Sequence, residues 1–150
     1  MTGNANAQYL QNDILSSDPI QLVRRLYGGA LKSIAEARTR LRAGDIPGRV
    51  REVTRAHAIL AELAQSLDHT RGGELSQNLA RLYDYLQRRL LEGNFRQSEA
   101  PFAEAEGLLR TLLEGWNQCQ LAADSEPLPA MSSDCLFAHM DGYEPVSVAG

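Results

Sequence analysis

The stretch "LARLYDYLQRRLLEGN" at residues 79–94 places large apolar side chains on more than one side of a predicted helix. If Leu86 marks the centre of the core face, Tyr83 lies about 60° to one side of it. Tyr85 lies about 100° to the other side, and Leu91 about 140° away. A single buried stripe needs fewer large residues than this. The surplus apolar surface therefore needs an explanation of its own.

The same helical spacing recurs along most of the chain. Apolar residues are repeated at threes and fours in residues 19–42, 47–67, 74–92 and 98–120, and we expect Gly93 to stop the third helix. No segment alternates with period two, so we expect no sheet. Short breaks between long helices favour an all-α fold, an antiparallel up-down four-helix bundle. The predicted core consists of Val23, Leu26, Ala30, Ile34, Ala37, Leu41, Val50, Val53, Leu60, Ala64, Leu67, Leu79, Leu82, Leu86, Leu90, Phe102, Ala105, Leu109, Leu112 and Trp116.

The two ends of the chain differ from the helical region in composition. Residues 1–17 are small, polar and aperiodic, and we expect a mobile N-terminal arm with an apolar hook at Tyr9 and Leu10. Residues 121–150 contain five acidic residues and no Lys or Arg, which predicts a disordered acidic tail. The bundle itself is expected to span residues 18–120.

Composition excludes several classes of function. The chain of 150 residues has a net charge of −4, and its acidic balance comes from the tail, so nucleic acid is not an expected partner. No apolar run approaches the roughly 18–20 residues that cross a bilayer. The first residues do not resemble a signal peptide, so we expect a cytosolic protein. Its two cysteines, Cys119 and Cys135, are expected to be free thiols there.

Motifs typical of metal-binding or catalytic sites are missing from the sequence. Helical bundles often hold metals on Glu-x-x-His pairs, but the residues three positions before the three histidines are Thr, Ser and Leu. No signature of a nucleophile or of a phosphate-binding loop is present. We therefore expect no enzyme, no metal, no cofactor and no small-molecule substrate.

Arginine residues gather around the break between the first two predicted helices, with acidic residues among them. Two interpretations remain open. A solvated and partly paired surface is favoured, and a site for an anionic partner is the alternative. The residues concerned are Arg38, Arg40, Arg42, Arg49, Arg51 and Arg55.

The second predicted helix also has apolar residues away from its core centre, with Ile59 at about 120° and Leu63 at about 80°. Such residues can widen the core, or they can line apolar grooves that something must cover. The cover could be a second copy, the chain's own arm or an amphipathic partner helix. The groove candidates are Leu31, Ile59, Leu63, Tyr83, Tyr85 and Leu91.

The sequence resembles the FliS family, the flagellin-specific export chaperones of bacterial flagella. The resemblance covers about residues 8–120, and the acidic tail departs from the family pattern. The matching stretches are "QYLQN" at 8–12, "DPIQLVRRLYGGAL" at 18–31, "RAHAILAEL" at 55–63, "GGELSQNLARLYDYLQRRLLEGN" at 72–94 and "AEAEGLLRTLLEGWNQ" at 103–118.

The resemblance implies a cytosolic chaperone that binds the C-terminal region of flagellin and prevents its premature polymerisation. It implies that the bound segment lies in apolar grooves around the bundle, and that the chaperone docks at the export-gate membrane protein. It also implies that the arm occupies the groove when flagellin is absent. Tyr9 matches the family tyrosine implicated in that contact and at the export gate, and we expect Leu10 of the hook to contribute beside it. The alternative is a self-associating structural bundle, with a homodimer covering the apolar faces.

Overall fold

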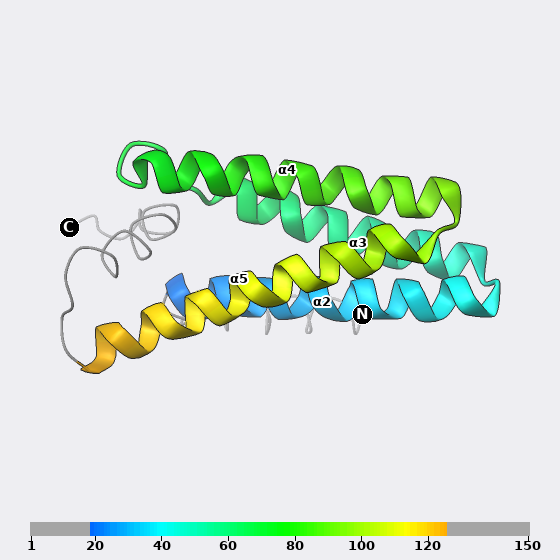
Figure 1. The fold of residues 1–150 in the computed structure, drawn as a ribbon, viewed down its shortest axis with the longest axis horizontal. Coiled ribbons are helices and arrows are strands. Elements are labelled where there is room, and N and C mark those ends of the chain that lie inside the picture. Colours follow the sequence, from blue (N-terminus) through cyan, green and yellow to red (C-terminus); the bar gives the residue numbers. More distant parts are fainter. Residues whose placement is uncertain (1–18, 126–150) are drawn as a thin grey trace, which may run out of the picture.

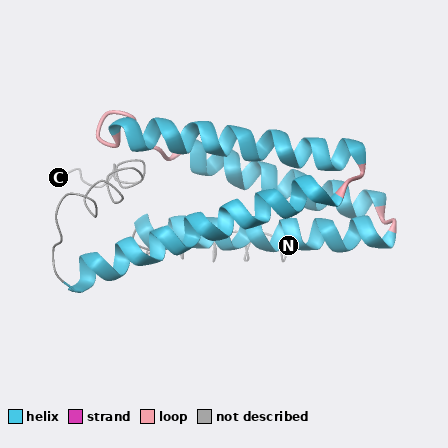
Figure 2. Ribbon diagram, in the orientation of Figure 1, coloured by secondary structure: helices cyan, strands magenta, loops and turns pink. Residues whose placement is uncertain are grey.

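The computed structural model describes residues 19–125, which form four long helices joined by short connections (Figures 1 and 2). No strand occurs between these two residues. The all-α four-helix bundle is confirmed. The helices are α2 (Pro19–Ala43), α3 (Ile46–Gln65), α4 (Gly73–Arg96) and α5 (Glu99–Ser125).

The helices run antiparallel and form a closed ring of neighbours. Helix α2 packs against α3 and α5, and α4 packs against the same two helices, so α2 and α4 lie diagonally across the bundle. The α2–α3 and α4–α5 connections meet at one end, on the right in Figure 1. The α3–α4 connection lies at the opposite end. This arrangement creates four seams between adjacent helices.

The break between α2 and α3 is a tight, capped turn. Gly44 has a φ of 72°, in the left-handed region that glycine adopts easily. The Asp45 carboxylate then accepts a hydrogen bond from the backbone N–H of Gly48 at 3.0 Å, which satisfies one free donor of the new helix. A Cβ at Gly48 would lie 2.3 Å from the Asp45 carboxylate, so this cap requires glycine.

The predicted end of the third helix at Gly93 is wrong. Helix α4 continues to Arg96 and ends at Gln97, whose φ of 52° is left-handed. Gly93 lies buried inside the helix, where an added Cβ would be 3.0 Å from the ring of Phe102 in α5. Glycine here permits close approach of two helices, and sequence alone does not distinguish this use from a helix stop.

Two further predictions, about the end of the last helix and about Cys119, are also wrong. Helix α5 extends to Ser125, five residues beyond the predicted end. Cys119 takes part in a disulfide bond, so the prediction of a free thiol is wrong at this position. The arm with Tyr9 and Leu10, and residues 126–150 of the tail with Cys135, lie outside the described residues.

The core largely follows the predicted stripes. Most of the predicted residues are buried, whereas Val50 is 41% exposed and was wrongly placed in the core. Leu26, Leu41, Ala64, Leu82 and Leu112 are partly buried against the core. Tyr27, which the periodicity did not select, is 0% exposed.

Tyr27 in α2 and Tyr83 in α4 meet across the centre of the bundle. Their hydroxyl oxygens lie 2.5 Å apart, and their ring centroids are separated by 6.3 Å. A further side-chain hydrogen bond joins Tyr27 to Trp116 of α5. Burial raises the pKa of Tyr27 to about 12 and raises that of Tyr83 well above its ordinary value. Both hydroxyls therefore stay neutral in the folded protein at physiological pH.

We expect Gly93→Val to lower the free energy of unfolding by about 1–3 kcal/mol, because it forces extra volume against Phe102. Gly107→Ala is the matched control, since a Cβ there meets nothing within 4 Å. That control should gain up to about 1 kcal/mol through helix propensity. Urea unfolding followed by circular dichroism measures both. Equal effects of the two variants would show that α4 and α5 do not approach closely at Gly93.

Candidate binding surface

Two of the six groove candidates belong to the core. Leu63 and Tyr83 are both 0% exposed, so the prediction that they lie off the core face is wrong. Each helix of the ring touches two neighbours, which widens its buried stripe beyond the angles assumed from sequence. These two side chains offer no surface to a partner. The remaining candidates, Leu31, Ile59, Tyr85 and Leu91, keep part of their surface exposed.

Ile59 of α3 lies at the seam with α2. A Cβ at Gly29 would be 3.3 Å from the Ile59 Cδ1 atom, so the glycine lets the isoleucine lean against α2. Beside this contact is a cleft of about 340 Å³ lined by both apolar and charged residues. The cleft is lined by Gly29, Lys32, Ser33, Glu36, Glu52, Arg55 and Ile59.

Tyr85 of α4 lies at the seam with α5. Its hydroxyl donates a hydrogen bond to the Glu104 carboxylate, and this bond raises the pKa of Tyr85. Arg89 contacts the same carboxylate, with its Nε atom 3.2 Å away. The tyrosine ring remains 39% exposed. Its polar end is thus fixed while its apolar face stays available to a partner.

Leu31 and Leu91 lie at the other two seams. Leu31 precedes Arg38 by two helical turns, and Arg38 pairs with glutamates of α5, so Leu31 shares the side of α2 that faces α5. Leu91 lies one turn before Asn94, which accepts a hydrogen bond from Arg49 of α3 at 2.8 Å. The four exposed candidates are therefore spread over four seams, and the structure does not bring them into one groove.

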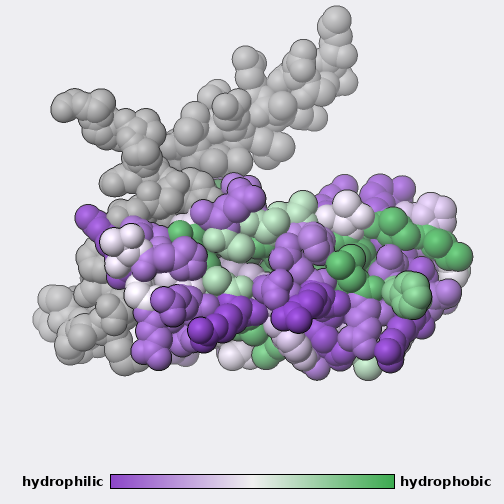
Figure 3. Space-filling model, turned by 90° about the horizontal axis from the view of Figure 1, so that it is seen from above, coloured by the Kyte–Doolittle hydropathy of each residue, from purple (hydrophilic) through white to green (hydrophobic). Residues whose placement is uncertain are grey.

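Exposed apolar side chains gather instead where α3 begins and α4 ends, and we call this surface the end patch. Its members form two pairs spaced by four residues, Ile46 with Val50 on α3 and Leu91 with Phe95 on α4. They are 52%, 41%, 50% and 86% exposed, respectively. Figure 3 shows apolar surface gathered at this end of the face formed by α3 and α4. Of these four residues, only Leu91 was predicted to lie on a binding surface, and Val50 was assigned to the core, although the spacing of four within each pair is visible in the sequence.

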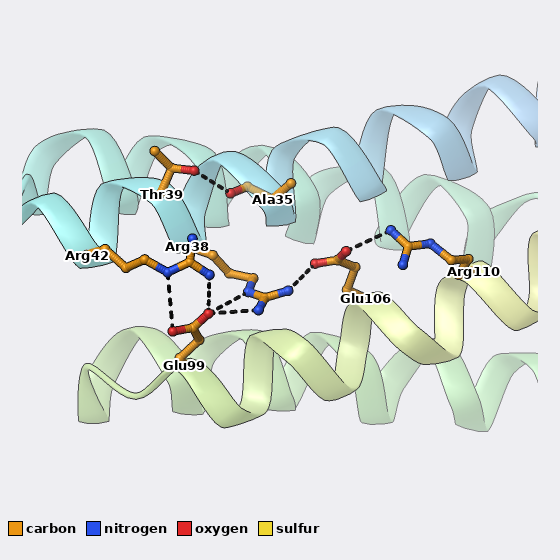
Figure 4. Close-up of polar contacts among 7 residues, drawn as sticks. All are labelled: Ala35, Arg38, Thr39, Arg42, Glu99, Glu106 and Arg110. Carbon is orange, nitrogen blue, oxygen red and sulfur yellow. Dashed lines mark hydrogen bonds and ion pairs between the residues drawn. The ribbon is translucent and has the colours of Figure 1, made fainter.

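The arginine cluster is mostly paired within the chain. Arg38 bridges Glu99 at 2.7 Å and Glu106 at 2.6 Å, and Arg42 also pairs with Glu99, so α2 is clamped to α5 (Figure 4). Arg110 of α5 joins the same network through Glu106 at 2.8 Å. Arg40 of α2 pairs with Asp45 at the start of α3 at 3.2 Å, and Arg55 pairs with Glu52 within α3 at 3.2 Å. For these four arginines of the predicted cluster, the favoured interpretation of a paired surface is confirmed.

The described residues offer little for chemistry. Between residues 19 and 125, no three His, Cys, Asp or Glu side chains gather in a way that could hold a metal. His57 contacts the Gln87 amide at 3.5 Å and lies at the α3–α4 seam. None of α2 to α5 is long and apolar enough to cross a bilayer. What this surface provides is exposed apolar area next to fixed charges.

Comparison with known proteins agrees with the sequence resemblance. The family described as "Flagellar protein FliS" matches residues 2–123. The chain belongs to the FliS family. It is 36% identical to the flagellar secretion chaperone FliS of Salmonella typhimurium over 110 residues, which cover 73% of this chain and 82% of that protein. It is 32% identical to the flagellar secretion chaperone FliSB of Pseudomonas aeruginosa, covering 72% of this chain and 86% of the relative. With FliS of Bacillus subtilis the identity is 31%, over 77% and 85% of the two chains.

The clamp between α2 and α5 predicts how stability depends on pH. Hydrogen bonds from Arg42 and then Arg38 lower the pKa of Glu99 from 4.5 to about 2. The stabilisation from ionised Glu99 is therefore complete above about pH 4.5 and is lost as the pH falls through about 2. We expect the stability difference between wild type and Glu99→Gln to shrink across this range, as measured by urea unfolding at several pH values.

Asp84→Asn is the control for this measurement, because Asp84 pairs with Arg88 within the same helix. Its effect on stability should be small throughout, as for most exposed pairs one turn apart. A Glu99→Gln difference that stays constant from pH 6 to pH 2 would contradict the role given to the clamp.

Proposed function

We propose that this protein is a flagellar secretion chaperone that binds the C-terminal region of flagellin. It prevents premature polymerisation and delivers flagellin to the export gate of the flagellar secretion apparatus, and its role is not enzymatic. Membership of the FliS family and the names of its relatives support the general role. The observation that carries the flagellin-binding proposal is apolar surface on all four seams and at the end patch.

The distribution of this surface suggests how the partner binds. Leu31, Ile59, Tyr85 and Leu91 lie on different seams, so a compact ligand cannot reach all of them. An extended segment that wraps around the bundle can, with short helical stretches in successive seams. Such a segment is disordered before binding and loses chain entropy when it orders. Burial of apolar area, at about 25 cal/mol per Å², offsets that cost and leaves a reversible complex.

Binding is best tested at an exposed position. We expect Leu91→Asp to weaken binding of a flagellin C-terminal fragment at least tenfold, because the new carboxylate loses its water against an apolar partner. Leu91 is 50% exposed, so the thermal unfolding of the variant should remain close to that of wild type. Isothermal titration calorimetry gives the affinities. Gln77→Asp, at an exposed position near the start of α4, is the control with the same new charge.

Sizing of the wild-type protein with and without the fragment separates the chaperone from a self-associating bundle. A chaperone forms a complex with flagellin whose formation depends on Leu91. A stable dimer that ignores the fragment would exclude the proposed function and favour self-association through the apolar faces.

The arm is proposed to cover part of the flagellin site in the free protein through Tyr9 and Leu10, and to contact the export gate. Removal of residues 1–17 should then strengthen flagellin binding modestly, since a competing contact within the chain is lost. It should also reduce flagellin export in cells. Titration of the full-length and shortened proteins with the same fragment measures the first effect. Equal affinities would argue against covering by the arm, and weaker binding would make the arm part of the flagellin site.

A further inference from the structure

Arg49 is the exception in the arginine cluster, because it is buried and has no carboxylate partner. Only 5% of its surface is exposed. Its Nε atom donates to the Asn94 side-chain oxygen at 2.8 Å, and its Nη2 atom contacts the Asn94 carbonyl oxygen at 3.4 Å. No Asp or Glu between residues 19 and 125 lies within ion-pair distance of it. A cation held this far from water is costly unless an opposite charge compensates it.

The third guanidinium nitrogen of Arg49 is the atom that a partner could reach. Nη1 makes no hydrogen bond to residues 19–125, and part of its surface is accessible to solvent. It therefore lies at the edge of the α3–α4 seam and carries unused donor capacity. A planar guanidinium with one side already fixed by Asn94 is well prepared to bind a carboxylate.

The apolar residues of the end patch flank Arg49 and Asn94 along the two helices. Ile46 and Val50 lie three residues before and one residue after Arg49, and Leu91 and Phe95 lie three residues before and one residue after Asn94. The Arg49–Asn94 hydrogen bond thus joins the turns of α3 and α4 that carry the two apolar pairs. A ligand that covers the apolar side chains would also exclude water from Arg49, and the electrostatic interaction would become stronger.

From this geometry we infer that the end patch binds an apolar helical segment that carries a carboxylate, which pairs with Arg49. The inference rests on the proposed function, in that it takes the segment from the C-terminal region of flagellin. A second copy of this chain fits less well. A two-fold symmetric contact centred on the patch would bring two Arg49 side chains toward each other without an acid between them.

Substitutions at Phe95 test the sign of the charge that the bound segment carries. Phe95 is 86% exposed and can be changed without loss of core packing. Phe95→Asp and Phe95→Lys remove the same apolar ring and add opposite charges. If the bound segment brings a carboxylate, Phe95→Asp should weaken binding of the flagellin fragment at least tenfold more than Phe95→Lys. Equal losses in the two variants would overturn the inference, while the proposed function would stand.

Arg49 itself is tested by Arg49→Gln, which keeps the capacity to hydrogen-bond Asn94 but loses the charge. We expect flagellin binding to weaken at least tenfold, and Arg49→Lys to recover part of the loss. Arg55→Gln on the same helix, at a mostly exposed side chain paired with Glu52, should change binding less than threefold. Thermal unfolding of each variant checks that the fold persists. Full affinity of folded Arg49→Gln would show that Arg49 only braces the α3–α4 contact and would overturn the inference.

A cycle of paired substitutions identifies the carboxylate. Each acidic residue of the flagellin fragment is replaced in turn by its amide and titrated against wild type and Arg49→Gln. One replacement should weaken binding to wild type tenfold and leave binding to Arg49→Gln unchanged.

Removal of residues 126–150 is the final comparison. Tighter flagellin binding on this removal, seen only when Arg49 is intact, would assign the site to the chain's own acidic tail and overturn the inference. If wild type binds no flagellin, the proposed function fails as well.

Discussion

The hydrogen-bonded pair of buried hydroxyls on Tyr27 and Tyr83 is the constraint on which the rest of the bundle depends. A buried hydroxyl without a partner costs free energy, so α2 and α4 must hold a fixed distance and register across the core. The contact from Trp116 adds α5 to the same arrangement. Apolar side chains alone would allow the helices to slide by small amounts, whereas this polar contact favours a single register.

That register decides which apolar residues remain for a partner. Once Tyr83 and Leu63 are buried in the core, the apolar residues left exposed are those farther from the core centre of each helix. They lie at the seams between adjacent helices and, in greater number, at the end patch. The large apolar residues of the "LARLYDYLQRRLLEGN" stretch are thus divided between core and surface. Tyr83 is buried in the core, whereas Tyr85 and Leu91 remain exposed.

The helices and their order could be predicted from sequence, because a period of 3.6 residues and the breaks at Gly and Pro are local signals. The predictions that failed depend on distances between helices. Gly93 has the sequence context of a helix stop but serves as a contact point for Phe102, and Val50 fits the core stripe although 41% of its surface stays exposed. The angles of about 60° for Tyr83 and 80° for Leu63 also do not decide whether these side chains are buried. The width of the buried stripe depends on how closely adjacent helices approach. The partnerless charge of Arg49 could not be found without knowing where each carboxylate lies.

Three further contacts that stiffen the bundle lie at the end where the end patch lies. The capped turn at Asp45, the clamp from Arg38 to Glu99, and the close contact of Gly93 with Phe102 all occur there. A surface that is already ordered loses little conformational entropy when it binds. For the segment that we propose binds there, the cost of ordering would then fall mainly on the segment itself. A patch on this rigid end would therefore need only a few apolar contacts and one charge to bind the segment proposed above.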